Sequence, residues 1–215
     1  MSRKLFICPI FSEISPRVLD ELAAALGERI NNGTQVYHAI GVEDPIEVPP
    51  DLEEEITTDF DERGTALRLG SMGGDDIGLL DYVMKHLPQT ETRKHILCVT
   101  DRNLVRYDYG WANKPHTFVN GECLWQPGVA ILTNHYISQE EHPDQLRLVL
   151  AMHETGHLRR IEKHCDTPVN GAYCAMASRG SLQDQDIVQP TLQNLADKYC
   201  DTCKAKIVDF ELNNF

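Results

Sequence analysis

The sequence lacks a hydrophobic run long enough to cross a membrane. A transmembrane helix needs about 20 consecutive apolar residues, whereas the apolar segment near the amino terminus spans only residues 4–10. No small-residue cleavage pattern of the kind that ends a secretion signal follows this segment. We therefore expect a buried strand at residues 4–10, and a cytoplasmic protein without a membrane partner.

Basic residues are few compared with acidic ones. The chain has 20 lysines and arginines against 33 aspartates and glutamates, a formal net charge of −13. Because such a chain repels phosphate backbones, we expect no nucleic-acid partner. The acidic residues concentrate at 43–44, 51–55 and 59–62, and we interpret the stretch 43–63 as a solvated surface loop.

Repeats and low-complexity tracts are absent as well. The chain has 215 residues, of which 41% are hydrophobic and 25% charged. This composition predicts one globular domain over residues 1–215, large enough to bury a substantial core.

The most informative motif is His153-Glu154-Thr155-Gly156-His157. Two histidines four residues apart on a helix lie on the same face, one turn above the other. This spacing lets both imidazoles bind one Zn²⁺, with the glutamate between them as general base for a zinc-activated water. A third histidine soon after the helix, His164, would complete a three-ligand site with one open position. The motif is typical of zinc peptidases.

The surrounding residues predict a helix from about 143 to 161. Pro143 stands at its start, and Leu146, Val149 and Leu150 form an apolar stripe that both histidines continue. Gly156 costs about 1 kcal/mol relative to alanine inside a helix. Close packing against another element beside the metal would explain it, and a merely tolerated glycine is the alternative.

Four of the seven cysteines lie near the carboxyl end of the sequence. Cys200-Asp201-Thr202-Cys203 is a CxxC motif, whose spacing lets two thiolates bind one tetrahedral ion, and Cys165 and Cys174 can supply the other pair. Because the motif follows a predicted helix at 190–199 instead of starting one, we favour structural zinc over redox chemistry or unligated thiols. Cys8 and Cys98 lie in apolar strand-like runs and are expected to be small buried hydrophobic residues.

These elements occur in an order that resembles the archaemetzincins, small zinc peptidases of the metzincin clan. They are His153-Glu154-x-x-His157, His164-Cys165, Cys174-Ala175-Met176 and Cys200-x-x-Cys203, with looser similarity at 99–101 and 118–122. The resemblance implies Met176 as the methionine packed beneath the metal. It also implies an edge strand that binds extended peptide substrate at Phe118, Val119, Asn120, Gly121 and Glu122.

The sequence departs from the metzincin pattern HExxHxxGxxH after the second histidine. Arg160 occupies the glycine position, Lys163 the third histidine position, and His164 follows one residue later. The glycine normally lets the helix end with a positive φ, which arginine adopts at some cost. The extra residue offers a wider turn as the alternative route to His164.

Periodicity predicts an α/β (α+β) fold, a mixed twisted sheet on which helices pack, including the helix that carries HExxH. Expected strands are 4–10, 34–42, 95–100, 118–123 and 129–133, and expected helices are 15–30, 76–86, 143–161 and 190–199. The archaemetzincin resemblance makes this a metzincin-like fold. Residues 1–157 would form an α/β subdomain, and residues 158–215 a small carboxyl-terminal subdomain held by the cysteine zinc.

The sequence therefore predicts a zinc peptidase with two Zn²⁺ per chain, one catalytic on the histidines and one structural on the cysteines. Glu154 would take the proton of the water and pass it to the leaving amine. Three alternatives remain: a zinc protein without catalytic activity, a zinc hydrolase with Asp166, Asp184 or Asp186 as third ligand, and a redox protein that uses Cys200 and Cys203. Asp166 is otherwise a candidate to orient a ligand histidine.

Overall fold

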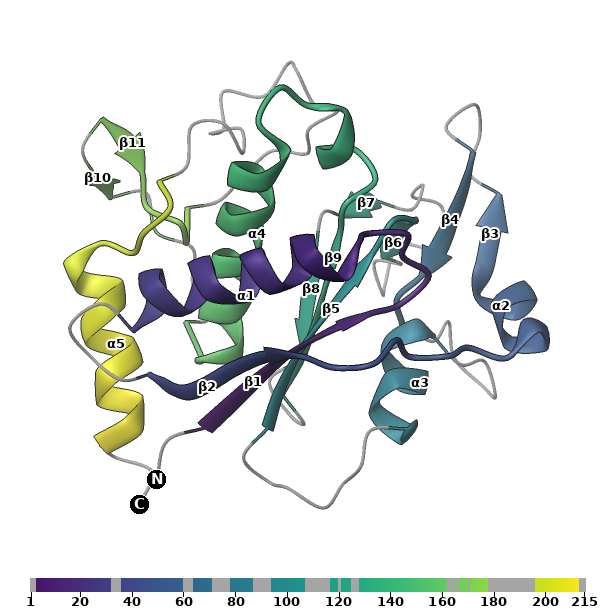
Figure 1. Cartoon of the computed structure of the whole chain (residues 1–215), viewed down its shortest axis with the longest axis horizontal. Coiled ribbons are helices and arrows are strands. Elements are labelled where there is room, and N and C mark those ends of the chain that lie inside the picture. Colours follow the sequence, from purple (N-terminus) through teal and green to yellow (C-terminus); the bar gives the residue numbers. More distant parts are fainter. Residues whose placement is uncertain are drawn as a thin grey trace.

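The protein folds around a five-stranded sheet that helices cover on both faces (Figure 1). The computed structural model describes residues 3–31, 36–59, 64–70, 78–86, 94–106, 117–119, 121–124, 128–161, 165, 167–169, 171–177 and 196–212. Within these residues, no helix has both the length and the apolar character needed to cross a membrane.

The five-stranded sheet has the order β2-β1-β5-β9-β8. Its strands are β2 (Tyr37–Val42), β1 (Arg3–Pro9), β5 (Lys94–Thr100), β9 (Val129–Thr133) and β8 (Gly121–Leu124). The first four are parallel, whereas β8 pairs antiparallel with β9 at the edge of the sheet. The predicted mixed sheet is thereby confirmed.

Alternate side chains of the central strands enter two different cores. Leu97 and Val99 of β5 pack toward α1 (Pro16–Ile30) and α4 (Pro143–Leu158), while Ile96 and Cys98 pack toward α2 (Pro50–Ile56) and α3 (Leu79–His86). A parallel sheet needs both faces covered because neither can be left to water. This double coverage explains the near-continuous apolar runs of β5 and β9.

A second sheet of four strands has the order β3-β4-β6-β7. Its strands are β3 (Thr57–Asp59), β4 (Thr65–Arg68), β6 (Asn103–Arg106) and β7 (Thr117–Val119). The predicted strand at 118–123 is therefore two strands, because β7 belongs to this sheet and β8 to the larger one. Each of the two lies at an edge of its sheet among the described residues.

The acidic stretch 43–63 was predicted as a loop, and this prediction is wrong for its central part. Residues Pro50–Ile56 form α2, and Thr57–Asp59 form β3. Leu52 and Ile56, four residues apart, are buried against the sheet, and consecutive prolines start the helix. The acidic side chains Asp51, Glu54 and Glu55 occupy its exposed side.

The carboxyl-terminal segment contains a short hairpin of β10 (Pro168–Val169) and β11 (Ala172–Tyr173) and the helix α5 (Asp201–Leu212). The predicted helix at 190–199 is wrong for its described part, because residues 196–200 are not helical. The amide of Ala196 donates to the carbonyl of Tyr173, and Ala175 donates to Lys198. These bonds take backbone groups away from a helix. The subdomain boundary at residue 157 stays a prediction.

Candidate metal centres

Helix α4 carries the HExxH motif and begins at Pro143, as predicted. It ends at Leu158, three residues before the predicted end. All its residues from Leu146 to Gly156 are buried, because α1, β8 and β9 surround it. A helix enclosed on most sides holds its side chains in fixed rotamers. The motif therefore sits on one of the most constrained elements of the fold.

The two histidines of the motif point their ring nitrogens at each other. The Nε2 atoms of His153 and His157 are 3.1 Å apart, and the ring planes are inclined by 77°. The Nδ1 atom of His153 donates to the carbonyl of Ala175, and that of His157 to the carbonyl of Ile161, both at 2.8 Å. Because a carbonyl only accepts, both rings carry their proton on Nδ1 and keep a lone pair on Nε2.

This arrangement fits a zinc ion. Two lone pairs that face each other at 3.1 Å repel unless a cation lies between them. Two imidazole nitrogens bound to one tetrahedral Zn²⁺ at about 2.1 Å lie roughly 3.4 Å apart. The observed separation is close to that value, so His153 and His157 are suited to hold one ion through Nε2.

Glu154 lies between the histidines and against the start of β8. Its side chain is only 1% exposed. A β-carbon built on Gly121 would overlap Oε1 of Glu154 and lie 2.6 Å from its Cδ. The backbone of β8 therefore approaches the carboxylate as closely as only glycine permits. The predicted general base and part of the predicted substrate strand are in contact.

Gly156 faces Met176 across the core. A β-carbon at this position would overlap Sδ of Met176 and lie 3.3 Å from Cε1 of Tyr199. Met176 is completely buried, and the hydroxyl of Tyr199 donates to the carbonyl of Met152 at 2.5 Å. The prediction that close packing explains this helical glycine is confirmed. The methionine lies directly beneath the turn of α4 that joins the two histidines.

The four carboxyl-terminal cysteines converge. The Sγ atoms of Cys165, Cys174, Cys200 and Cys203 all lie within 4.8 Å of one another, and those of Cys165 and Cys200 are 3.6 Å apart. None of them forms a disulfide. Among the described residues this is the only group of three or more side chains with metal-binding spacing. Four sulfurs at this spacing suit a tetrahedral Zn²⁺.

Cys174 is set up to be a thiolate. A hydrogen bond with Cys203 lowers its pKa to about 5 against the opposing effect of burial, and the backbone amides of Cys200 and Met176 add to the lowering. These amides lie 3.3 and 3.5 Å from Sγ. The same Cys174 contact, together with burial, raises the pKa of Cys203. A metal ion is what allows several such thiols to ionise together.

The CxxC motif starts a helix, contrary to the prediction that it follows one. Cys200 immediately precedes α5, and Cys203 lies in its first turn. Because the argument against redox chemistry used the opposite placement, that argument is wrong. A different argument favours a metal site: Cys165 and Cys174 converge on Cys200 and Cys203, whereas a redox pair requires only two sulfurs.

The comparisons with known proteins give the fold. No protein-family model and no curated protein sequence matches the chain. Among solved structures, an archaemetzincin from Methanopyrus kandleri aligns with a TM-score of 0.62 and 16% identity over 99% of this chain and 97% of its own. A zinc-dependent peptidase from Methanocorpusculum labreanum aligns with a TM-score of 0.58 and 19% identity over 95% of this chain and 98% of its own.

The chain has the archaemetzincin fold. The resemblance predicted from the sequence is confirmed at this level. The solved neighbours span almost the full chain, so the similarity covers both the segment that bears the histidines and the one that bears the cysteines.

The archaemetzincin fold accommodates Arg160 where the metzincin pattern has glycine. Its φ is +61°, the left-handed value that the glycine would provide. The amide of Ile161 donates to the carbonyl of Gly156 and that of Arg160 to His157, which is the hydrogen-bond pattern of a Schellman motif. The predicted cost to arginine therefore applies, while the wider turn to His164 stays a prediction because residues 162–164 lie outside the described residues.

His164 lies outside the described residues, as do Asp166, Asp184 and Asp186. Its role as third ligand stays a prediction, and so do the roles of the three aspartates. The described residues place the chain as far as Ile161, whose amide closes the turn at the end of α4.

The predicted substrate strand divides between the two sheets of the archaemetzincin fold. Phe118 and Val119 belong to β7, Gly121 and Glu122 belong to β8, and Asn120 between them lies outside the described residues. Sequence reasoning included Gly121 only as a member of this strand. Its contact with Glu154 has a recognisable signal, because glycine within a strand marks a close approach of the backbone.

Proposed function

We propose that this protein is a zinc-dependent peptidase that hydrolyses peptide bonds at the HExxH centre. The observation that carries the proposal is the convergence of two Nε2 lone pairs, 3.1 Å apart, beside a buried glutamate. The archaemetzincin fold supports it, since the solved neighbours include a protein described as a zinc-dependent peptidase. A second Zn²⁺ on the four cysteines would hold the carboxyl-terminal segment.

His153 and His157 would hold the catalytic ion, with His164 as the third ligand. The carbonyls of Ala175 and Ile161 fix the tautomer and orientation of the first two rings. Zinc at this position supplies polarisation of the scissile carbonyl and lowers the pKa of water to about 7. Met176 acts by packing beneath the histidines and not as a ligand.

Glu154 would be the general base. Its side chain lies on the same turn of α4 as the histidines and is nearly excluded from water. It takes a proton from the attacking water and delivers it to the leaving amine. The backbone of β8, at the edge of the sheet and against this carboxylate, would pair with an extended peptide. Such pairing uses main-chain groups, so it tolerates many sequences.

The test is the Glu154→Gln variant. Glutamine keeps the size of the side chain but cannot accept a proton, so we expect two bound Zn²⁺ and a fall in peptide turnover of at least about 100-fold. Zinc content is measured by mass spectrometry and turnover on a mixture of unstructured peptides. The matched control is Glu141→Gln, an exposed glutamate just before α4, which should leave turnover unchanged.

Two results would overturn parts of this proposal. Undiminished turnover in Glu154→Gln eliminates the assigned general base. Full zinc loading with no hydrolysis of any peptide by the unaltered protein favours a zinc protein without catalytic activity. The third ligand is tested separately, because His164→Ala that keeps both metal and turnover would point to an aspartate ligand instead.

A further inference from the structure

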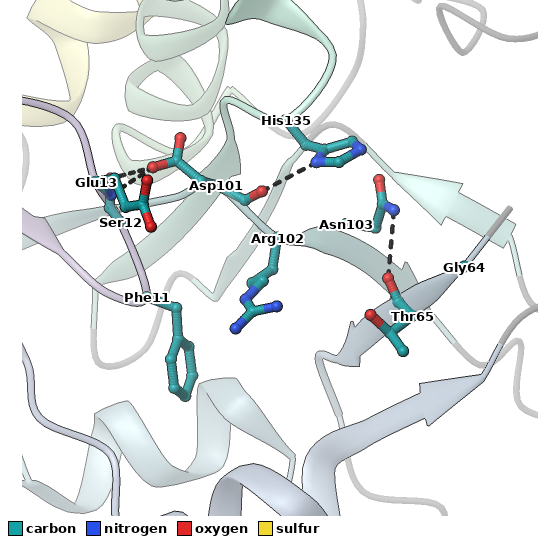
Figure 2. A pocket seen from close by; sticks show the side chains of 9 residues that line it. All are labelled: Phe11, Ser12, Glu13, Gly64, Thr65, Asp101, Arg102, Asn103 and His135. Carbon is teal, nitrogen blue, oxygen red and sulfur yellow. Dashed lines mark hydrogen bonds between the residues drawn. The ribbon is translucent and has the colours of Figure 1, made fainter.

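A cavity of about 750 Å³ opens at the carboxyl ends of the parallel strands, and no residue of either candidate metal centre lines it (Figure 2). It is lined by Phe11, Ser12, Glu13, Gly64, Thr65, Asp101, Arg102, Asn103 and His135. These residues follow β1, β5 and β9 on one side and begin β4 and β6 on the other. This edge of a parallel sheet is where α/β proteins bind ligands, and the size suits a small molecule.

The wall of the cavity is pre-organised by Asp101. Its carboxylate accepts hydrogen bonds from the hydroxyl of Ser12 and the amide of Glu13, at 3.0 and 2.6 Å, and from the side chain of Asn134 at 2.7 Å. The loop that it holds includes Phe11, whose φ is +47°. A non-glycine residue in this conformation persists only where its surroundings fix it.

Asn103 contributes a buried acceptor to the wall of the cavity. Its side chain is 4% exposed, and Nδ2 donates to the carbonyl of Thr65 at 3.3 Å. Its Oδ1 atom has no hydrogen-bond partner among the described residues, and Figure 2 shows this oxygen on the opposite side of the amide from Thr65. A buried acceptor without a donor is unfavourable, so the site is suited to a ligand that brings an N–H group.

His135 supplies a second acceptor. Its Nδ1 atom is 3.1 Å from the carbonyl of Asp101. Because that carbonyl accepts, Nδ1 carries the proton and Nε2 keeps a lone pair. The carboxylate of Glu13 lines the same space. The Oδ1 atom of Asn103, the Nε2 atom of His135 and the carboxylate of Glu13 suit an amine ligand with three N–H donors.

The cavity also has a positively charged side chain. The guanidinium of Arg102 lines the cavity, and among the described residues its one ion pair is a 3.5 Å, solvent-exposed contact with Glu53, so it can bind a carboxylate. The ring of Phe11 adds an apolar surface. We propose that this cavity binds a small zwitterion with an ammonium and a carboxylate group, namely a free apolar amino acid or a dipeptide. The proposal does not depend on the metal chemistry.

The test is isothermal titration of the zinc-loaded protein with L-leucine and glycyl-L-leucine. We expect saturable binding of at least one, and the tighter of the two identifies the source of the zwitterion. N-acetyl-L-leucine lacks the ammonium group and L-leucinamide lacks the carboxylate. Each should bind at least about tenfold more weakly than L-leucine if the amino acid is the ligand, since each loses a charged hydrogen-bonding group.

Substitutions of residues that line the cavity test whether the ligand binds there. Arg102→Gln should weaken binding about tenfold and remove the discrimination against L-leucinamide. Asn103→Ala should weaken binding of the ammonium group. Because Asn103 is buried, its variant is interpreted only if it folds, and Arg102, which is half-exposed, keeps the test decisive. The matched control is Arg17→Gln on the exposed side of α1, which should bind as the unaltered protein does.

Two results would overturn the proposal. One is the absence of saturable binding of either zwitterion up to about 10 mM, where the free energy of binding is too small for a specific site. The other is unchanged affinity in Arg102→Gln, which would place the ligand elsewhere, for example at the metal.

Discussion

The histidine pair and the cysteine cluster assemble in opposite ways. His153 and His157 are four residues apart on one helix, and their Nε2 atoms are 3.1 Å apart. Cys165 and Cys200 are 35 residues apart, and their sulfurs are 3.6 Å apart. The helix brings the two histidines to one face by their spacing, whereas the cysteine cluster requires several loops to meet. Metal at the cysteines should therefore govern folding, and metal at the histidines should govern activity.

Removing one cysteine ligand should have the largest effect. We expect Cys203→Ser to lower the zinc content from two ions to one and the free energy of unfolding by about 4 kcal/mol or more, the contribution of a ligand present at 1,000 times its Kd. Chemical denaturation and metal analysis measure both. The control is Cys123→Ser, which lies on β8 outside the cluster. Retention of two ions by Cys203→Ser would contradict a four-cysteine site.

Gly121→Ala should alter the histidine centre without altering the cysteine centre. The added methyl group overlaps Oε1 of Glu154, so the carboxylate must move. Since displacement of a catalytic group by about 1 Å can cost 100-fold in rate, we expect a loss of turnover of that order. Gly41→Ala on β2 is the control, because its methyl group meets nothing within 4 Å. Equal turnover in the two variants would argue against Glu154 as the base.

Gly156→Ala tests the packing that joins the two regions. Its methyl group would overlap Sδ of Met176, so overpacking should destabilise the protein by about 1–3 kcal/mol despite the better helix propensity of alanine. Thermal denaturation measures the loss. In the control Gly27→Ala, the methyl group meets only Ile40, at 3.8 Å, and the variant should gain stability. In the double variant Gly156→Ala/Met176→Ala, the loss of stability should be smaller than the sum of the two single losses. A loss equal to that sum would refute the contact.

Arg160→Gly should have the smallest effect of these variants, and it should stabilise the protein instead of destabilising it. Glycine adopts the left-handed conformation of this position, φ +61°, without the cost that an L-side chain carries. We expect a gain of about 1 kcal/mol in the free energy of unfolding and no change in zinc content. Arg160→Ala keeps the β-carbon and removes the charge, so it should not gain. If both variants gain equally, the effect belongs to the side chain and not to the backbone.

The sequence predicted best what depends on local periodicity. Helices α1 and α4 and strands β1, β5 and β9 carry long apolar patterns, and their positions were predicted within a few residues. Strands β4 and β6, of four residues each, were missed because so short a segment becomes a strand only through its neighbours.

At the metal centres, too, some features follow from local sequence and others depend on tertiary structure. The helix α4 that carries His153 and His157 follows from spacing alone. The contact between Gly121 and Glu154 and the position of the CxxC motif at the start of α5 depend on tertiary structure. The helix predicted at 190–199 is wrong for its described part, residues 196–199, because Ala196 and Lys198 bond to Tyr173 and Ala175 instead. Partners that are distant in the sequence cannot be predicted from the local residues.

The turn that ends α4 has a consequence for how the chain tolerates changes in length. The carbonyl that orients His157 belongs to Ile161, the residue that closes the Schellman motif. The carbonyl that orients His153 belongs to Ala175, beside Met176. Both constraints on the histidine rings lie outside positions 162–164, so an inserted residue there shifts His164 in register and leaves the anchors of the other two histidines in place. The helix end thus separates the carbonyl that anchors His157 from the segment that leads to His164 in the sequence.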